Sequence, residues 1–186
     1  MPIERKDAKQ LLTESVMELA EKKTINKIGV AEIARNCRMS NSNFYHHFSS
    51  KYELISYIIN TAIDERIDFG PMSLQCLFSE LLDILEEEPV FYTNVLSNTL
   101  VEYPNHAFFH EALDAKIKDL IITNCMYKKP DRHDDLILHV YLAGITAAMC
   151  SHLINHRLGR EELMEAFIVA MPDRLRPLMH MKEMMV

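Results

Sequence analysis

Hydrophobic residues recur along this chain at the three- and four-residue spacing of amphipathic helices. The segment 51–68 shows this clearly, because Leu54, Ile55, Ile58, Ile59 and Ile63 fall on one helical face. No segment alternates apolar and polar residues as a half-buried strand does, and no segment is repeated. Glycine is scarce, with 4 residues, and tryptophan is absent. We therefore predict an all-α fold.

Glycine, proline and capping residues interrupt the pattern and divide the chain into nine predicted helices. These lie at about 8–20, 30–37, 41–48, 51–68, 73–88, 91–100, 106–126, 131–156 and 161–170. The acidic run Glu86–Glu88 is expected to be a solvated helix end, and this end is expected to fray because carboxylates there oppose the helix dipole. The Met-rich tail after Pro172 is expected to be loosely held.

The segments 30–37 and 41–48 have the form of a helix-turn-helix, two short helices joined by a tight turn and packed on a longer preceding helix. Such a unit lays its second helix in the major groove of DNA and rests its first on the backbone. Phe44 and Phe48 are four residues apart and should face the core. The other faces then carry uncharged polar groups and no acid, which suits a negatively charged groove.

These residues resemble a known family. The segments Ile28–Ala34 and Met39–Leu54, with the string FYHHFSSKYEL, are similar to the N-terminal domain of the TetR family of bacterial regulators. The resemblance covers about residues 7–60. It implies a three-helix DNA-binding domain at residues 1–50. It also implies a larger helical domain for regulation and dimerisation at 51–186, reached through a connecting helix at Lys51–Asp68.

Two positions depart from the family pattern. Gly29 stands at the start of the second helix, where the family often has threonine, and it offers no hydroxyl to a phosphate. Arg38 stands in the helix-helix turn, where the family usually has glycine. If that backbone needs positive φ, arginine adopts it at a cost of roughly 1 kcal/mol. Contact with a phosphate could offset this cost, or the turn has another shape.

The resemblance also implies which residues contact DNA. Carried over by position, they are Val30, Ser40, Asn41, Ser42, Tyr45, His46, His47 and Lys51. Lys51, Tyr45 and His47 suit phosphate contacts, whereas Asn41 and His46 are the better candidates for base edges. For Tyr45 the alternative is packing against the fourth helix, and His46 and His47 could be ordinary surface histidines.

The charge distribution separates the two ends of the chain. The net charge is -7, but residues 1–60 carry nine Lys or Arg against seven Asp or Glu, whereas the remainder carries eleven against twenty. A mildly basic head on an acidic body suits a protein that touches phosphate with one end only.

Little in the sequence points to an enzyme. We find no Gly-rich phosphate loop, no GxSxG and no convincing acid-base pair, so we expect neither catalysis nor a cofactor. The pairs His106/His110 and His152/His156 have spacing that could hold a metal, but no third ligand accompanies either pair, and we expect no metal site.

The four cysteines form no CxxC pair, so we interpret them as reduced, mostly buried thiols. With no secretory signal and no run of about 18 apolar residues, we expect a cytoplasmic protein without a membrane span.

Besides DNA binding, we predict a homodimer built from the last two helices. Small residues three and four apart in 131–156 let two helices approach closely, and the resemblance favours a four-helix interface. The predicted interface residues are Ala143, Gly144, Ala147, Ala148, Ser151, Ile154, Leu163 and Phe167. The alternative is that the helix 131–156 is buried inside one subunit, which also explains small residues.

The third prediction is a signal-binding cavity among the helices of residues 73–156. Its candidate lining residues are Phe78, Tyr92, Tyr103, Phe109, His110 and Tyr141, which could instead fill a solid core. The signal is an unidentified small molecule or a co-regulator protein, since parts of 91–96 and 141–145 look similar to dihydroxyacetone-kinase regulators. We expect a repressor that binds a near-palindromic operator in double-stranded DNA. The alternative is a metal-sensing or protein-interaction module without specific DNA binding.

Overall fold

The computed structural model describes residues 7–67, 70–97, 107–155 and 159–179. Within these ranges the regular elements are helices, and the only extended pairing is an isolated antiparallel bridge between Met126 and Met179. The predicted all-α fold is therefore confirmed.

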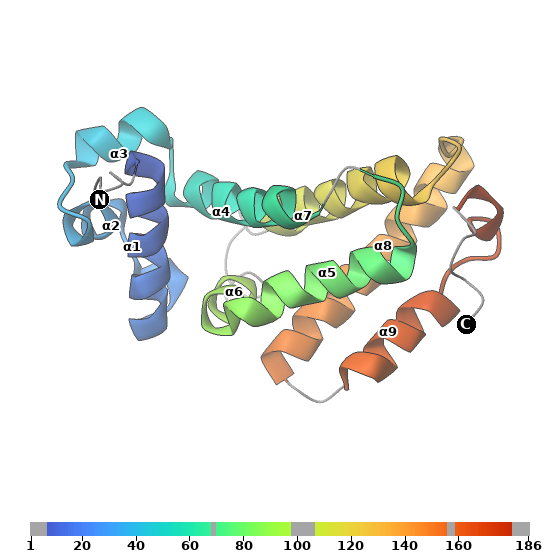
Figure 1. Cartoon of the computed structure of the whole chain (residues 1–186). Coiled ribbons are helices and arrows are strands. Elements are labelled where there is room, and N and C mark those ends of the chain that lie inside the picture. The colour runs from blue at the N-terminus through green and yellow to red at the C-terminus, as the bar shows by residue number, and fades with distance from the viewer. Residues whose placement is uncertain (1–6, 68–69, 98–106, 156–158, 180–186) are drawn as a thin grey trace, which may run out of the picture.

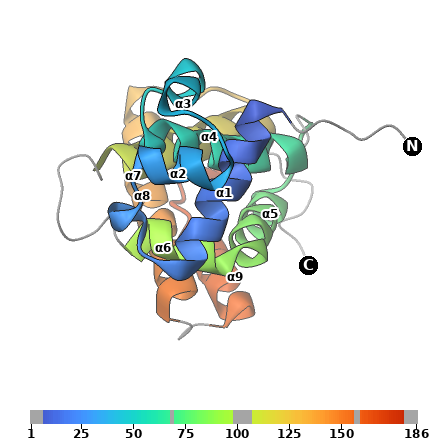
Figure 2. The same ribbon diagram turned by 90° about the vertical axis from the view of Figure 1, so that its left-hand side faces the viewer.

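The N-terminal head is a small helical bundle. It contains α1 (Ala8–Lys22), a 3₁₀ turn η1 (Ile25–Lys27), α2 (Val30–Asn36) and α3 (Asn41–His47). The side chains at its centre are apolar and almost completely buried: Leu12, Val16, Ile28, Ile33, Ala34 and Phe44. Figure 2 views the molecule from the end that carries these helices, with α2 and α3 on the outer side. The head thus presents its two short helices away from the rest of the chain.

The body begins with α4 (Lys51–Arg66), which runs out of the head (Figure 1). The helices that follow are α5 (Leu74–Glu87), α6 (Pro89–Ser97), α7 (Ala107–Leu120), α8 (Arg132–Asn155) and α9 (Arg160–Val169). The π-helical turn η2 (Ile121–Cys125) follows α7, and the 3₁₀ turn η3 (Arg176–Leu178) follows α9. Helix α6 lies against both α1 and α8, so it connects the head to the body.

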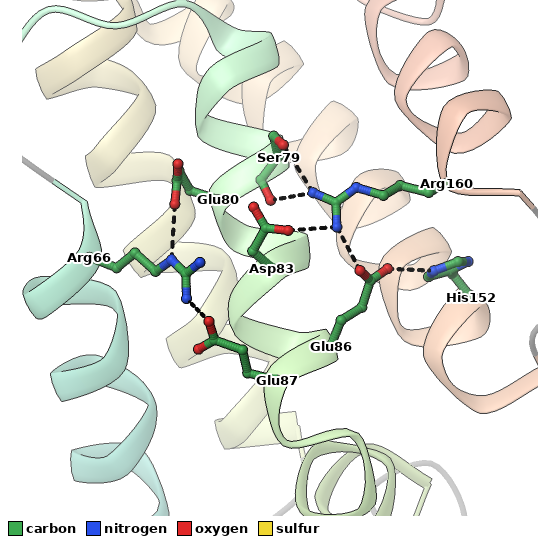
Figure 3. Close-up of polar contacts among 8 residues, drawn as sticks. All are labelled: Arg66, Ser79, Glu80, Asp83, Glu86, Glu87, His152 and Arg160. Atoms are coloured by element: carbon green, nitrogen blue, oxygen red, sulfur yellow. Dashed lines mark hydrogen bonds and ion pairs between the residues drawn. The ribbon is translucent and has the colours of Figure 1, made fainter.

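Helix α5 is tied to its neighbours on two sides by ion pairs (Figure 3). On one side Arg66 of α4 pairs with Glu80 and Glu87. On the other, the guanidinium of Arg160 lies 2.7 Å from Asp83 and 2.6 Å from Glu86 and donates to the Ser79 carbonyl and hydroxyl. His152 of α8 also contacts Glu86, at 3.1 Å.

These pairs change the interpretation of the acidic run. Glu86 and Glu87 are not only solvated, because guanidinium groups from two other helices pair with them and offset the unfavourable dipole term. His152 of a third helix also contacts Glu86. Their partners lie 66 to 74 residues away for Glu86 and 21 for Glu87, so local spacing gives no sign of them.

Other differences lie at helix ends and in the tail. Pro89 ends the preceding helix, as predicted, but it is also the first residue of α6, where its missing N–H costs nothing. The predicted helix 106–126 closes with the π-helical turn η2. The tail is packed as far as Met179: Leu175 and Met179 are buried, and the Tyr127 N–H donates to the Leu178 carbonyl at 3.2 Å.

One described helix is long and apolar enough to span a membrane by those two criteria. It is α8, whose most apolar window has a mean hydropathy of 1.6 and is 44% buried inside the protein. A buried core helix satisfies the same criteria, and α8 contacts α5, α6, α7 and α9. We interpret α8 as the central helix of the body.

Candidate nucleic-acid interface

Helix α3 separates into a buried face and a polar exposed face. Phe44 and Phe48 are buried, as their spacing predicts. Asn41, Ser42 and His46 are exposed, and His47 is half-buried. Tyr45 is 57% exposed and lies edge-on to the Phe44 ring, so it does not pack into the core. The exposed face offers hydroxyl, amide and imidazole groups and no carboxylate.

The start of α3 is fixed by a side-chain cap. The Ser40 hydroxyl accepts a hydrogen bond from the Asn43 N–H at 3.1 Å, which satisfies one of the free donors of the first turn. Its own O–H proton is still available to an acceptor outside the protein. Val30, at the start of α2, is half-buried and packs against the head core. Its side chain is thus partly used for packing, and its backbone N–H is one of the free donors at that helix end.

The turn between α2 and α3 contains a left-handed residue. Arg38 has a φ of 61° and is the only non-glycine residue with positive φ in the described chain. The Met39 N–H donates to the Ala34 carbonyl at 2.7 Å and the Arg38 N–H to the Arg35 carbonyl at 3.0 Å. This is the Schellman arrangement of a helix end, in which glycine normally occupies the left-handed position. By contrast Gly29 has a φ of -96°, which any residue adopts.

Lys51 points into the head. Its ammonium donates to the carbonyls of Ile25 at 2.8 Å, Asn26 at 3.2 Å and Ile28 at 2.9 Å. Burial lowers the pKa of Lys51. The three donors of the ammonium are therefore used to hold the η1 loop against the start of α4.

Asn94 of α6 holds the other side of the same loop. Its amide donates to the carbonyls of Ala20 at 2.8 Å and Lys23 at 2.7 Å, which lie at the C-terminal end of α1. Its carbonyl accepts from the Ile25 N–H at 2.8 Å. Because Ile25 is bound by Asn94 through its N–H and by Lys51 through its C=O, η1 is clamped between α6 and α4.

The charges on the head are unevenly paired. Glu18 pairs with Lys22, and Glu32 pairs with Lys23. Lys27, Arg35 and Arg38 are exposed, and no carboxylate of the described chain pairs with any of them. The net positive charge of the head is thus concentrated on α2, its preceding loop and the turn into α3, next to the polar face.

Comparison with known proteins agrees with this geometry. Residues 12–58, which run from Leu12 of α1 through α2 and α3 to the middle of α4, match the model for bacterial regulatory proteins of the tetR family. The N-terminal head is therefore similar to the DNA-binding domain of tetR-family regulators. No curated protein sequence matches the chain significantly.

Solved structures of TetR-family regulators share the fold over nearly the whole chain. A TetR transcriptional regulator from Rhodococcus sp. RHA1 superimposes with a TM-score of 0.62 at 18% identity, covering 94% of this chain and 100% of that one. The dihydroxyacetone kinase operon activator DhaS gives 0.57 at 19% identity, covering 87% and 90%. A tetR-family regulator from Streptomyces coelicolor gives 0.54 at 17%, covering 90% and 79%. The body therefore has the helical fold of the C-terminal part of these structures.

The predicted interface residues of the body divide into two groups. The first group lies on α8 and is exposed or half-exposed: Ala143, Gly144, Ala147, Ala148, Ser151 and Ile154. Leu163 and Phe167 of α9 are instead buried within the subunit, where the Phe167 ring lies edge-on to Phe78, 5.1 Å between centroids. Larger exposed apolar side chains stand beside the small ones: Leu136 is 58% exposed and Val140 65%.

The predicted cavity residues are only partly brought together. A small cavity of about 20 Å³ lies between α4, α5, α6, α7 and α8, and of the predicted residues it includes Tyr92. Phe78 and Tyr141 lie elsewhere, in the packing of α5 and α8 against α9, where the Tyr141 hydroxyl donates to the Phe167 carbonyl. Tyr103 lies outside the described residues, as do the side chains of Phe109 and His110.

The small cavity is apolar and carries no charged group. Its lining is Ile59, Ile63, Leu81, Ile84, Leu85, Tyr92, Ile117, Thr146, Met149 and Cys150. The Thr146 hydroxyl is buried and finds no partner within the described chain. Burial raises the pKa of Tyr92 to about 12, helped by Glu88 and Glu87, and burial raises the pKa of Cys150 to about 12. Both groups are neutral at physiological pH.

A second, open cleft lies between the head and the body. It has a volume of about 750 Å³ and is lined by α1, α4, the end of α5, and Tyr92. Tyr92 therefore borders both the small cavity and the cleft, two residues before Asn94 on α6.

The structure brings together no metal site in the part of the chain it describes, where no three His, Cys, Asp or Glu side chains cluster suitably. Of the histidine pairs considered above, His106 and His156 lie outside the described residues, and His152 contacts Glu86. None of the four cysteines forms a disulfide in the described chain; Cys125 and Cys150 are buried and Cys76 is exposed.

Proposed function

We propose that this protein is a cytoplasmic transcriptional regulator that binds double-stranded DNA as a homodimer. The observation that carries the proposal is the exposed, acid-free face of α3 on a TetR-type helix-turn-helix. A polar helix face next to unpaired cations is what a major groove flanked by phosphates accommodates. Because a symmetric dimer presents two such helices, the operator should be near-palindromic.

The contacts divide by chemistry. Asn41 and His46 are the candidates for base edges, and Asn41 favours adenine if its amide reaches N6 and N7. Ser40, Ser42, Tyr45 and His47 suit phosphate oxygens, as does the backbone N–H at Val30. We propose Lys51 as a positioning residue, because its three donors are already used by loop carbonyls.

We propose that the dimer forms through the exposed side of α8. Small residues at Ala143, Gly144 and Ala147 allow close helix approach, and Leu136 and Val140 supply apolar area beside them. An added Cβ at Gly144 meets nothing within 4 Å, so that position faces open space in one subunit. Leu163 and Phe167 are buried in the single subunit, so in this proposal they hold α9 in place and the partner contacts fall to α8.

We propose that the signal acts on α6. A neutral, mostly apolar ligand with one hydrogen-bonding group would suit the small cavity, where Thr146 offers an unpaired hydroxyl. A volume of about 20 Å³ is close to the room that one water needs, so such a ligand must displace side chains, Tyr92 among them. Moving Tyr92 would move Asn94 and hence α1. A ligand has this effect only if it binds one arrangement better than the other.

A co-regulator protein is the other candidate for the signal, and one structural neighbour, DhaS, is named as an operon activator. We expect repression, with the dimer occupying promoter DNA. A reporter gene placed behind the selected site decides this point: higher expression with the protein present would mean activation instead.

The proposal is tested by binding to the duplex that the wild-type protein selects from random DNA. Asn41→Ala should relax sequence preference, whereas Tyr45→Phe should weaken binding to all sequences about equally, because it removes one hydroxyl donor and keeps the ring. Gln75→Ala is the control, because it removes an exposed amide from α5, outside the head, and should change neither property. If Asn41→Ala and Tyr45→Phe bind as the wild type does, the α3 face is not the interface. A protein-interaction module would then be the better proposal.

A further inference from the structure

Arg38 occupies a backbone position that an arginine adopts at a cost. Its φ of 61° lies in the left-handed region, where the Cβ of any L-residue crowds the following carbonyl oxygen. The two backbone hydrogen bonds of the Schellman turn fix this conformation, so the side chain cannot relieve it by a local rotation. Glycine would make the same turn without that cost.

Within the described residues, the Arg38 side chain makes no contact that would offset the cost. It is exposed, and it makes no ion pair or side-chain hydrogen bond with the described chain. Three arginines of the body are used differently, because Arg66, Arg160 and Arg174 each contact two acidic groups. The guanidinium group of Arg38 is therefore permanently charged and directs its five N–H donors to the solvent.

The position of this guanidinium group would allow it to contact a phosphate of the DNA backbone. Arg38 lies two residues before the Ser40 cap, between the helix that rests on the backbone and the helix that enters the groove. This turn is at the end of the molecule farthest from α9 (Figure 1). We propose that Arg38 binds a backbone phosphate beside each half-site, as a bidentate contact that carries no sequence information. The inference rests on the proposed DNA-binding function. It adds a contact at a turn position where the family usually has glycine, which has no side chain to make one.

The test compares stability and DNA binding in the same variant. Arg38→Gly should raise the melting temperature by about 2–4 °C, because it removes the left-handed cost. The same variant should lose affinity for the selected duplex. A dimer gives up two phosphate contacts, so the slope of log K against log salt should become shallower by about 1.8, and binding in about 0.1 M salt should weaken by at least about tenfold.

Two further variants separate the causes. Arg38→Asn tolerates positive φ but carries no charge, so it should lose affinity as Arg38→Gly does. Arg132→Gln removes the same charge from the exposed start of α8 and should leave the salt slope unchanged. Equal affinity and slope for Arg38→Gly and the wild type would overturn the inference, even if wild-type binding confirms the proposed function. A wild type that binds no DNA would overturn both.

Discussion

Replacing Asn94 by alanine tests the link between the head and the body. The variant removes two donors from the carbonyls of Ala20 and Lys23 and one acceptor from the Ile25 N–H, bonds of 2.7 to 2.8 Å. The three backbone groups lie at the junction of α1 and η1, beside α6. Lys51 would still hold Ile25 from the other side through its carbonyl. The expected result is a weakened attachment of the head, with its own core intact.

The magnitude follows from these three bonds. A typical hydrogen bond contributes about 1 kcal/mol net, so the free energy of unfolding should fall by about 3 kcal/mol. If the head and body unfold as one unit, that is a large part of a stability of about 5–15 kcal/mol. Asn155→Ala is the matched control, because within the described chain its amide makes one exposed bond, to Ser151 at 3.2 Å. Its effect should stay within about 0.5 kcal/mol.

Urea unfolding gives the free energies, and amide hydrogen exchange locates the effect. The Ile25 N–H loses its acceptor in Asn94→Ala, so its exchange should become faster, while the amides of the head core, such as Phe44, should keep their protection. If Asn94→Ala costs no more than Asn155→Ala and the Ile25 amide exchanges at the wild-type rate, Asn94 does not hold the head to the body.

Three other substitutions test separate parts of the account. Lys51→Met should lower the free energy of unfolding by about 2–3 kcal/mol, because it removes an ammonium that donates to three carbonyls. The same variant should keep the salt slope of DNA binding, and a shallower slope would show a phosphate contact instead. Gly144→Leu should keep helix content, because the site is open in one subunit, and should shift sedimentation from dimer to monomer; an unchanged dimer would place the interface elsewhere. Gly29→Ser should raise stability by a few tenths to about 1 kcal/mol in thermal unfolding, since its extended backbone suits a capping hydroxyl; a decrease would contradict the N-cap geometry.

Local periodicity is enough to predict most of the helices and the two faces of α3. The spacing of Phe44 and Phe48 alone assigns both to the core, and both are buried. The sequence also points to a left-handed backbone at Arg38, because the family places glycine in that turn. These features depend on residues within a few positions of one another, where sequence spacing determines geometry.

Contacts between distant segments cannot be predicted in the same way. Lys51 meets carbonyls 23 to 26 residues earlier, and Asn94 meets α1 and η1 at 69 to 74 residues. Leu163 and Phe167 show the same helical spacing whether they face a partner subunit or the core of their own. The small cavity likewise gathers side chains from five helices, and aromatic composition alone does not single out Tyr92 from Phe78 and Tyr141.

Selection from random duplex DNA tests the central claim most directly. The dimer should enrich an inverted repeat whose half-sites are about one helical turn apart or a multiple of it, because two α3 helices related by two-fold symmetry read the same sequence on opposite strands. The enriched duplex should bind more weakly as salt rises, as phosphate contacts require. Recovery of no enriched sequence, or of one without a repeat, from a protein that is folded and dimeric would contradict the claim.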